Sequence, residues 1–213
     1  MATKLISLFA AALATLSLQA QPASPACPPA NLVTNRPLYA TDVQHVGGPN
    51  LLPGDFAYVT FETNKFGFVM PAGFRLEMQA TQQVTLVSAD LNCLLGFRVV
   101  EPLPPGVTEL DPALYRDRVL SRRPGGKIVE EFSQAAVNRH GPAFDLRWNA
   151  AGSVPRRERV LFIPSPAGVL EFSLVSSPEK FECGRQGFNA MLLTFRTQEP
   201  DGRLVMPVLS NRF

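Results

Sequence analysis

A run of alternating apolar and polar side chains in the second half of the chain constrains the fold more than any other feature. From Phe144 to Trp148 every second side chain is apolar, while Asp145 and Arg147 face the other way. This is the pattern of a strand with one buried face. Further strand patterns, separated by short turns, cover residues 132–136, 159–163 and 170–174. Consecutive strands joined by short loops predict an antiparallel meander.

Between the weaker strand patterns of the first half and this meander, the sequence changes to a helical period. Asp111 precedes Pro112, which is the usual pairing of an N-cap with proline in the first turn. Apolar residues then recur at helical spacing up to Arg123, and residues 124–126 (Pro-Gly-Gly) end the helix.

A second helix is expected after Ser177, which is an N-cap followed by proline. Its apolar stripe consists of Phe181, Phe188, Met191, Leu192 and Phe195. Such a stripe indicates a face packed on a sheet. Gly184 and Gly187 weaken the first turns, so the firm part of the helix is expected to begin only near Gln186.

The chain divides into a signal segment, a lead and one domain. Residues 21–55 are rich in proline and poorly patterned, and residues 56–213 are expected to form a single α+β domain. Within its first half, short strand patterns cover residues 56–62, 66–70, 84–88 and 94–100.

Residues 1–20 have the three parts of a cleavable secretory signal. Lys4 precedes an apolar run over residues 5–18, and Ala20 is suited to precede the cut, with Ala23 as the alternative. The run is shorter than the roughly 20 apolar residues that a membrane span needs. We therefore expect a periplasmic or secreted protein, without a transmembrane segment once the signal has been removed.

The chain has three cysteines, Cys27, Cys93 and Cys183. In an oxidising compartment two of them can form a disulfide, and Cys93–Cys183 is favoured because both belong to the folded body. The alternative is three free thiols. A lipid anchor on Cys27 is disfavoured, because Ser24 stands where a lipoprotein signal has a leucine-like residue.

The motifs of common enzyme and cofactor chemistry are missing from the sequence. There are two histidines, His45 and His140, and no GxSxG or HExxH motif occurs. Residues 123–127 lack the first glycine and the Ser or Thr of a phosphate-binding loop. Glu130 and Glu131 are neighbours, so on a strand they point to opposite faces and are expected to be edge-strand charges. No cofactor and no metal is expected.

The densest basic clusters, residues 116–127 and 156–159, contain arginines interspersed with Asp117 and Glu158. A solvated face explains them better than a nucleic-acid patch, because acids are interspersed among the arginines and export argues further against a nucleic-acid partner.

A structural role alone does not explain one set of polar residues. Asp145 and Arg147 share a strand face, and His140 is expected in the turn before them. The two charged side chains either pair with each other or with a neighbouring strand, or they line a polar groove. His140, Asp145 and Arg147 are therefore the candidate polar-face site.

Three phrases resemble the PsbP-like family, which includes PsbP and DcrB-like proteins. Phe66–Phe74 (FGFVMPAGF) resembles its opening strand, Val160–Ser173 its late hairpin, and Glu179–Arg196 its closing helix. The resemblance implies an α/β/α sandwich with a central antiparallel sheet and helices on both faces. It also implies a non-enzymatic binding or assembly module, and it supplies no catalytic residues.

The leading hypothesis is an exported, non-enzymatic binding or assembly-support module of the cell envelope or extracellular space. Its partner would be another envelope or secreted protein. The alternatives are an envelope hydrolase of unusual type and a carrier of a small ligand or lipid, which requires an apolar pocket between sheet and helix.

Overall fold

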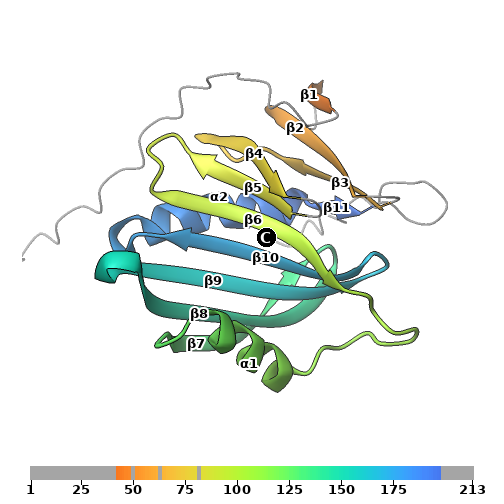
Figure 1. The fold of residues 1–213 in the computed structure, drawn as a ribbon. Coiled ribbons are helices and arrows are strands. Elements are labelled where there is room, and N and C mark those ends of the chain that lie inside the picture. Colours follow the sequence, from red (N-terminus) through yellow and green to blue (C-terminus); the bar gives the residue numbers. More distant parts are fainter. Residues whose placement is uncertain (1–41, 49–50, 62–63, 81–82, 198–213) are drawn as a thin grey trace, which may run out of the picture.

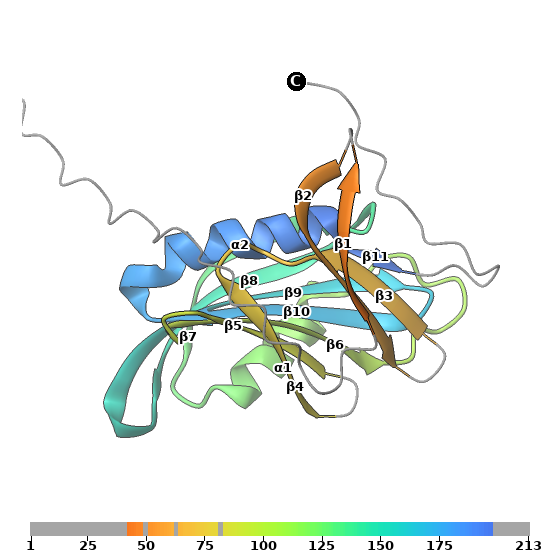
Figure 2. The same cartoon turned by 90° about the horizontal axis from the view of Figure 1, so that it is seen from above.

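A seven-stranded antiparallel sheet forms the centre of the fold, with one helix on each face and a smaller sheet beside it (Figures 1 and 2). The structure, a computed structural model, describes residues 42–48, 51–61, 64–80 and 83–197. The predicted α+β sandwich, with a central antiparallel sheet and two main helices packed on it, is confirmed.

The central sheet contains the predicted meander. In chain order its strands are β4 (Phe74–Ala80), β5 (Gln83–Ser88), β6 (Cys93–Glu101), β7 (Lys127–Ala136), β8 (Arg139–Ala150), β9 (Val154–Ser165) and β10 (Gly168–Ser176). They lie side by side in the order β4-β5-β6-β10-β9-β8-β7. Strand β10 therefore joins the meander to the earlier strands by pairing with β6 as well as β9.

Helix α1 (Pro112–Arg122) covers one face of the meander half of the sheet. The predicted cap is present, because the Asp111 carboxylate accepts a hydrogen bond of 2.9 Å from the Ala113 N–H. Tyr115 and Val119 point down onto β8 and β9, where the apolar positions of the alternating strand meet them. Figure 1 shows α1 at the β7–β8 end of the sheet, with no described helix in front of β5 and β6.

Helix α2 (Phe181–Thr194) covers the opposite face and begins earlier than Gln186, where the sequence placed its firm part. Its glycines face the sheet at very close range. A Cβ atom at Gly184 would lie 2.7 Å from Cδ1 of Leu174, and one at Gly187 would lie 2.9 Å from Cε2 of Phe74. Tertiary packing thus outweighs the low helix propensity of glycine.

Phenylalanine rings fill the space between the sheet and α2. The fully buried ones are Phe66, Phe68, Phe97, Phe172, Phe181, Phe188 and Phe195. The ring of Phe195 lies 4.7 Å from that of Phe97 and 4.8 Å from that of Phe172, both edge to face. This interior is packed with side chains at the place where the carrier hypothesis requires a pocket.

The smaller sheet contains β1 (Asp42–Gly48), β2 (Leu51–Phe61), β3 (Asn64–Val69) and β11 (Arg196–Thr197). Strand β1 and the start of β2 fall inside the stretch 21–55 that the sequence assigned to an irregular lead, so regular structure begins before residue 56. The signal segment 1–20 and Cys27 lie outside the described residues. Within the described ranges, no helix is both long and apolar enough to cross a bilayer.

Candidate functional site

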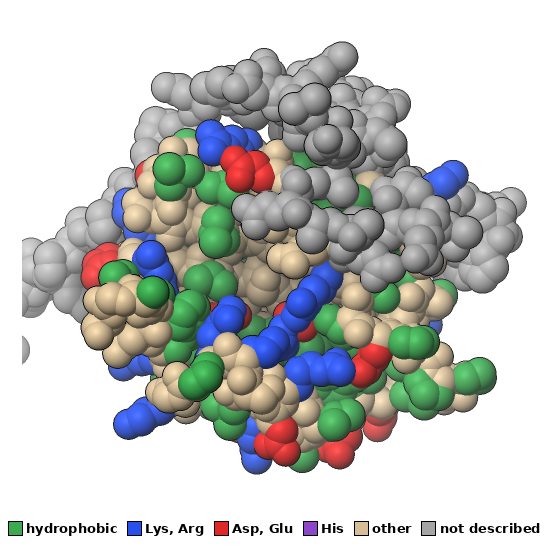
Figure 3. Space-filling view, viewed as in Figure 1, with side chains coloured by type: hydrophobic (Ala, Val, Ile, Leu, Met, Phe, Trp, Pro, Cys, Tyr) green, Lys and Arg blue, Asp and Glu red, His purple; other side chains and the backbone are tan. Residues whose placement is uncertain are grey.

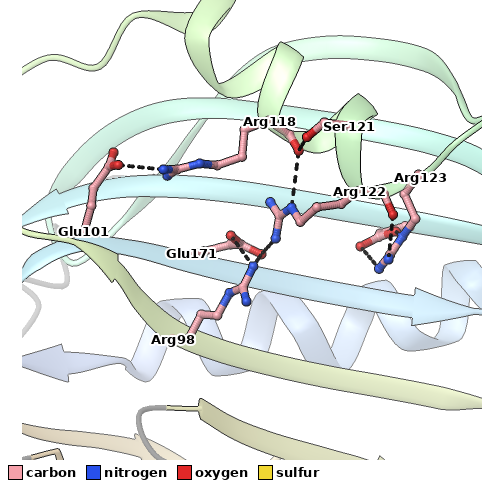
Figure 4. Close-up of polar contacts among 8 residues, drawn as sticks. Arg98, Glu101, Arg118, Ser121, Arg122, Arg123 and Glu171 are labelled. Carbon is pink, nitrogen blue, oxygen red and sulfur yellow. Dashed lines mark hydrogen bonds and ion pairs between the residues drawn. The ribbon is translucent and has the colours of Figure 1, made fainter.

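The end of α1 carries arginines that reach back onto the sheet. Arg118 and Arg122 stand one helical turn apart, so they share one side of α1, and Arg123 is the helix C-cap. Their partners are acids on the sheet face that α1 covers in part (Figure 4). We call Arg98, Arg118, Arg122, Arg123, Glu101, Glu158 and Glu171 the arginine cluster.

Glu171 is the centre of the arginine cluster. It lies directly opposite Arg98 in the pairing of β10 with β6, and Arg98 Nη2 is 3.1 Å from both of its carboxylate oxygens. Arg122 Nη1 donates to the same carboxylate at 2.7 Å. Glu171 is only 5% exposed, whereas the side chains of Arg98 and Arg122 are 36% and 32% exposed. A buried carboxylate thus holds two arginines that remain partly open to solvent.

The second pair of the cluster anchors the end of α1. Arg123 makes two parallel hydrogen bonds to Glu158, of 2.6 Å and 2.9 Å, and its guanidinium lies 4.5 Å from the centre of the Trp148 ring. A bidentate pair that also stacks on an aromatic ring has its geometry fully determined. Arg123 therefore has a structural role.

The third pair involves Glu101 at the end of β6. Tyr115 donates a hydrogen bond of 2.6 Å to this carboxylate, and Arg118 Nη2 lies 2.7 Å from it. The hydrogen bond from Tyr115 is the main cause that lowers the pKa of Glu101, and Arg118 adds to it. Burial and the same carboxylate raise the pKa of Tyr115. Neither group is suited to exchange protons near neutral pH.

The cluster has more hydrogen-bond donors than acceptors. Its four arginines face three carboxylates, which leaves one positive charge. Among the described residues, Nη1 of Arg118 and Nη2 of Arg122 are buried without a hydrogen-bond partner. Guanidinium groups with spare N–H donors bind carboxylate or phosphate oxygens. Figure 3 shows the basic side chains gathered near the middle of this face.

Small side chains lie next to the cluster on the same face. Thr85, Gly96 and Ser173 are register partners across β5, β6 and β10. A Cβ atom at Gly96 would lie 2.9 Å from the carbonyl oxygen of Val84, so a larger residue does not fit at this position without a shift of the backbone. Leu94, in the next register row, is 41% exposed. Thr85 and Gly96 are buried and Ser173 is half-buried, so the face combines partly exposed arginines with the exposed side chain of Leu94.

The structure does not bring the predicted polar-face site together. Asp145 lies under α2, 2% exposed, and both of its oxygens accept from its cross-strand neighbour Arg159 at 2.6 Å and 2.8 Å. Arg147 is exposed near the far end of β8. His140 lies within β8 and not in a turn, and it faces the opposite side of the sheet from Asp145.

His140 lies at the rim of a separate hollow of about 530 Å³ on the α1 side. Glu109, Glu131 and Phe144 also line it, and Glu131 forms an ion pair with Arg116. Glu131 belongs to β7, an edge strand of the sheet, as the sequence indicated. In the described part of the chain, no group of three or more His, Cys, Asp or Glu side chains is placed to hold a metal ion.

The predicted Cys93–Cys183 disulfide is wrong. The Cys93 thiol is free and buried at the start of β6, where its Sγ lies 3.7 Å from the carbonyl oxygen of Lys180. Burial is the main cause that raises its pKa to about 11. Cys183 is disulfide-bonded, so its partner is a different cysteine.

Comparison with known proteins supports the fold and nothing finer. No protein-family model matches the chain, and no curated protein matches it. Solved structures with a similar architecture were found, and they show that the chain has a PsbP-like fold, as the resemblance implied.

Two of these structures are similar along most of their own length. Cyanobacterial PsbP (CyanoP) from Synechocystis sp. PCC 6803 has 11% identity and a TM-score of 0.50 over 70% of this chain and 96% of its own. LpqN, involved in cell envelope biogenesis of Mycobacterium tuberculosis, has 13% identity and a TM-score of 0.45 over 67% of this chain and 90% of its own.

Proposed function

We propose that the chain is an exported, non-enzymatic binding module of the cell envelope or extracellular space, and that it contacts another envelope or secreted protein through the α1-side face. The export signal in residues 1–20 supports the compartment. The PsbP-like fold fits such a role, although a fold does not determine a function.

One observation carries the proposal: the arginine cluster holds partly exposed arginine side chains on the face of the sheet that also carries the exposed side chain of Leu94. Because Glu171 and Glu101 bind these arginines, their side chains are ordered before any partner arrives, and less conformational entropy is lost on binding. A face of this kind is suited to recognition of a partner.

The same geometry argues against a hydrolase at this face. Covalent hydrolysis needs a nucleophile beside a base that a third group orients. His140 and Asp145 lie on opposite faces of β8, and Asp145 is occupied by Arg159. The packed phenylalanine interior likewise argues against a carrier with its ligand between the sheet and α2.

Site-specific photo-crosslinking in the native host tests the proposal. A photoreactive amino acid replaces Leu94 on the α1-side face, and a matched control replaces Leu193 on α2, which is 65% exposed. We expect a crosslinked protein product at Leu94 that is absent at Leu193. No product at Leu94, or the same products at both positions, would contradict the proposed binding face.

A further inference from the structure

We infer that the ligand recognised by the arginine cluster is a carboxylate of an acidic peptide segment that also carries apolar side chains. This inference rests on the proposed function and names the chemistry of the partner. It depends on three properties of the described residues: the unused donors, the charge left over, and the neighbouring floor of the sheet.

The unused donors lie on three neighbouring arginines. Arg98 gives only Nη2 to Glu171, so its Nε and Nη1 have no hydrogen-bond partner in the described part of the chain. Arg118 and Arg122 each leave one terminal nitrogen unpaired, Nη1 and Nη2 respectively. These two nitrogens are buried, and both side chains are about one third exposed. An acceptor that binds at these arginines would pair donors that the described part of the protein leaves unpaired.

The charge of the cluster favours a carboxylate over a phosphate. Three carboxylates already neutralise three of its four arginines, and Glu171 and Glu158 are each about 5% exposed. One further carboxylate would neutralise the remaining charge. A phosphate group, with a charge of about −1.5 to −2, would leave an excess of negative charge beside these buried acids.

The floor beside the cluster favours a peptide over a free ion. Leu94 is exposed and Ser173 is half-buried on the face of the sheet that also carries Arg98, so a bound segment can contact Leu94 while its carboxylate reaches the arginine cluster. A small anion gains nothing from this apolar surface. An acidic residue flanked by leucine or valine gains from both parts of the face.

Binding of defined probes tests the inference. The full mature protein is titrated with a blocked pentapeptide of alternating leucine and glutamate, with the same peptide carrying glutamine, and with inorganic phosphate. Binding is followed by the NMR signals of the arginine Nε–H groups. We expect the glutamate peptide to bind at least tenfold more tightly than the glutamine peptide or phosphate, and to lose affinity as salt is raised.

Three single-residue variants test whether the glutamate peptide binds at the arginine cluster. Arg122→Gln is expected to raise the Kd of the glutamate peptide about tenfold, which corresponds to about 1.4 kcal/mol. Because Arg122→Gln also weakens the hold on buried Glu171, Arg118→Gln is the second variant: Glu101 is 30% exposed and keeps its bond to Tyr115. Arg147→Gln, exposed near the far end of β8, is the matched control and should leave the Kd unchanged.

Three results would overturn the inference: equal binding of the glutamine peptide, tighter binding of phosphate than of the glutamate peptide, or no change with Arg118→Gln. These failures are distinct from failure of the proposed function. Crosslinking at Leu94 without peptide binding would keep the binding face and reject the acidic ligand. Peptide binding without any crosslink at Leu94 would keep the acidic ligand and reject the proposed binding face.

Discussion

Asp145 and Arg159 are direct cross-strand neighbours on β8 and β9, and Arg159 closes a two-bond pair on both oxygens of Asp145 beneath α2. The Arg159 guanidinium also lies 4.7 Å from the centre of the Phe132 ring. Arg157 Nη2 lies 3.5 Å from the same carboxylate. The desolvation cost of these buried charges is offset by their opposite-charge partners. The pair therefore belongs to the architecture of the α2 side, and its two members depend on each other.

Asp145→Asn should consequently lower the free energy of unfolding by about 3–5 kcal/mol, because it leaves Arg159 buried without a counter-charge. Urea denaturation of the mature protein measures this. The control is Arg147→Gln, two residues along the same strand and exposed, for which a change within about 0.5 kcal/mol is expected. A loss below 1 kcal/mol for Asp145→Asn would show that the pair contributes little.

The turn between β5 and β6 should give a distinct acid dependence of stability. A hydrogen bond of 2.6 Å from Ser88 is the main cause that lowers the pKa of Asp90 from 3.8 to about 2. Because the folded pKa lies below the unfolded one, this stabilisation is present above pH 4 and is lost as the pH falls toward 2. Asp90 is exposed, so after solvent screening we expect about 1 kcal/mol.

Asp90→Asn should remove this part of the pH dependence. The measurement compares unfolding free energies of the wild type and Asp90→Asn between pH 5 and pH 2. The difference between the two proteins should shrink across this range, and Ser88→Ala should flatten the wild-type slope in the same interval. Parallel curves for wild type and Asp90→Asn would contradict the assignment.

Gly184→Ala should destabilise the fold although alanine is the better helix former. The new methyl group would lie 2.7 Å from Leu174 Cδ1 and 3.1 Å from Cys93 Sγ. Overpacking of this kind costs about 1–3 kcal/mol, which exceeds or cancels the gain in helix propensity of about 1 kcal/mol. Thermal unfolding measures the change, with Gln186→Ala on the exposed side of α2 as the control. An increase in Tm for Gly184→Ala would show that the contact relaxes freely.

The cysteines give a prediction that one mass spectrum can check. Cys93 is free, whereas Cys183 is disulfide-bonded. Peptide mapping of the unreduced protein should therefore recover the Cys93 peptide with a free thiol, and the unlinked Cys183 peptide only after reduction. Cys93 should react with iodoacetamide only after unfolding, since its pKa is raised to about 11. A Cys93–Cys183 link would contradict this.

Much of the fold was predictable because its signals are local. The alternation around Phe144 and the Asp111 cap each lie within a few residues, and both elements formed as predicted. Strand β4 was missed, and the end of the β7–β8 hairpin was misplaced. The strand already resumes at Arg139 after Asn138, so His140 falls inside β8. Turn-forming residues place a turn only to within a few residues, because the two strands can continue to pair into the predicted turn.

The candidate site was not predictable to the same degree. Arg122 and Glu171 are 49 residues apart in the chain and meet only because α1 packs on the face of the sheet that carries Glu171. The arginines of residues 116–127 were interpreted as a solvated face, and no pattern pointed to their partners. The one available signal was Glu171 itself, an acid in a strand whose neighbours are all apolar or small.

The central place of β10 has a consequence for how the chain acquires its structure. Strands β4–β6 and β7–β9 are two separate half-sheets until β10 pairs with both, and β10 ends only at Ser176, directly before α2. The hydrophobic core therefore cannot close until most of the polypeptide is available, and every earlier fragment lacks the strand that unites it. For the exported protein that we propose, such late closure would keep a translocating polypeptide free of stable structure until its C-terminal third follows.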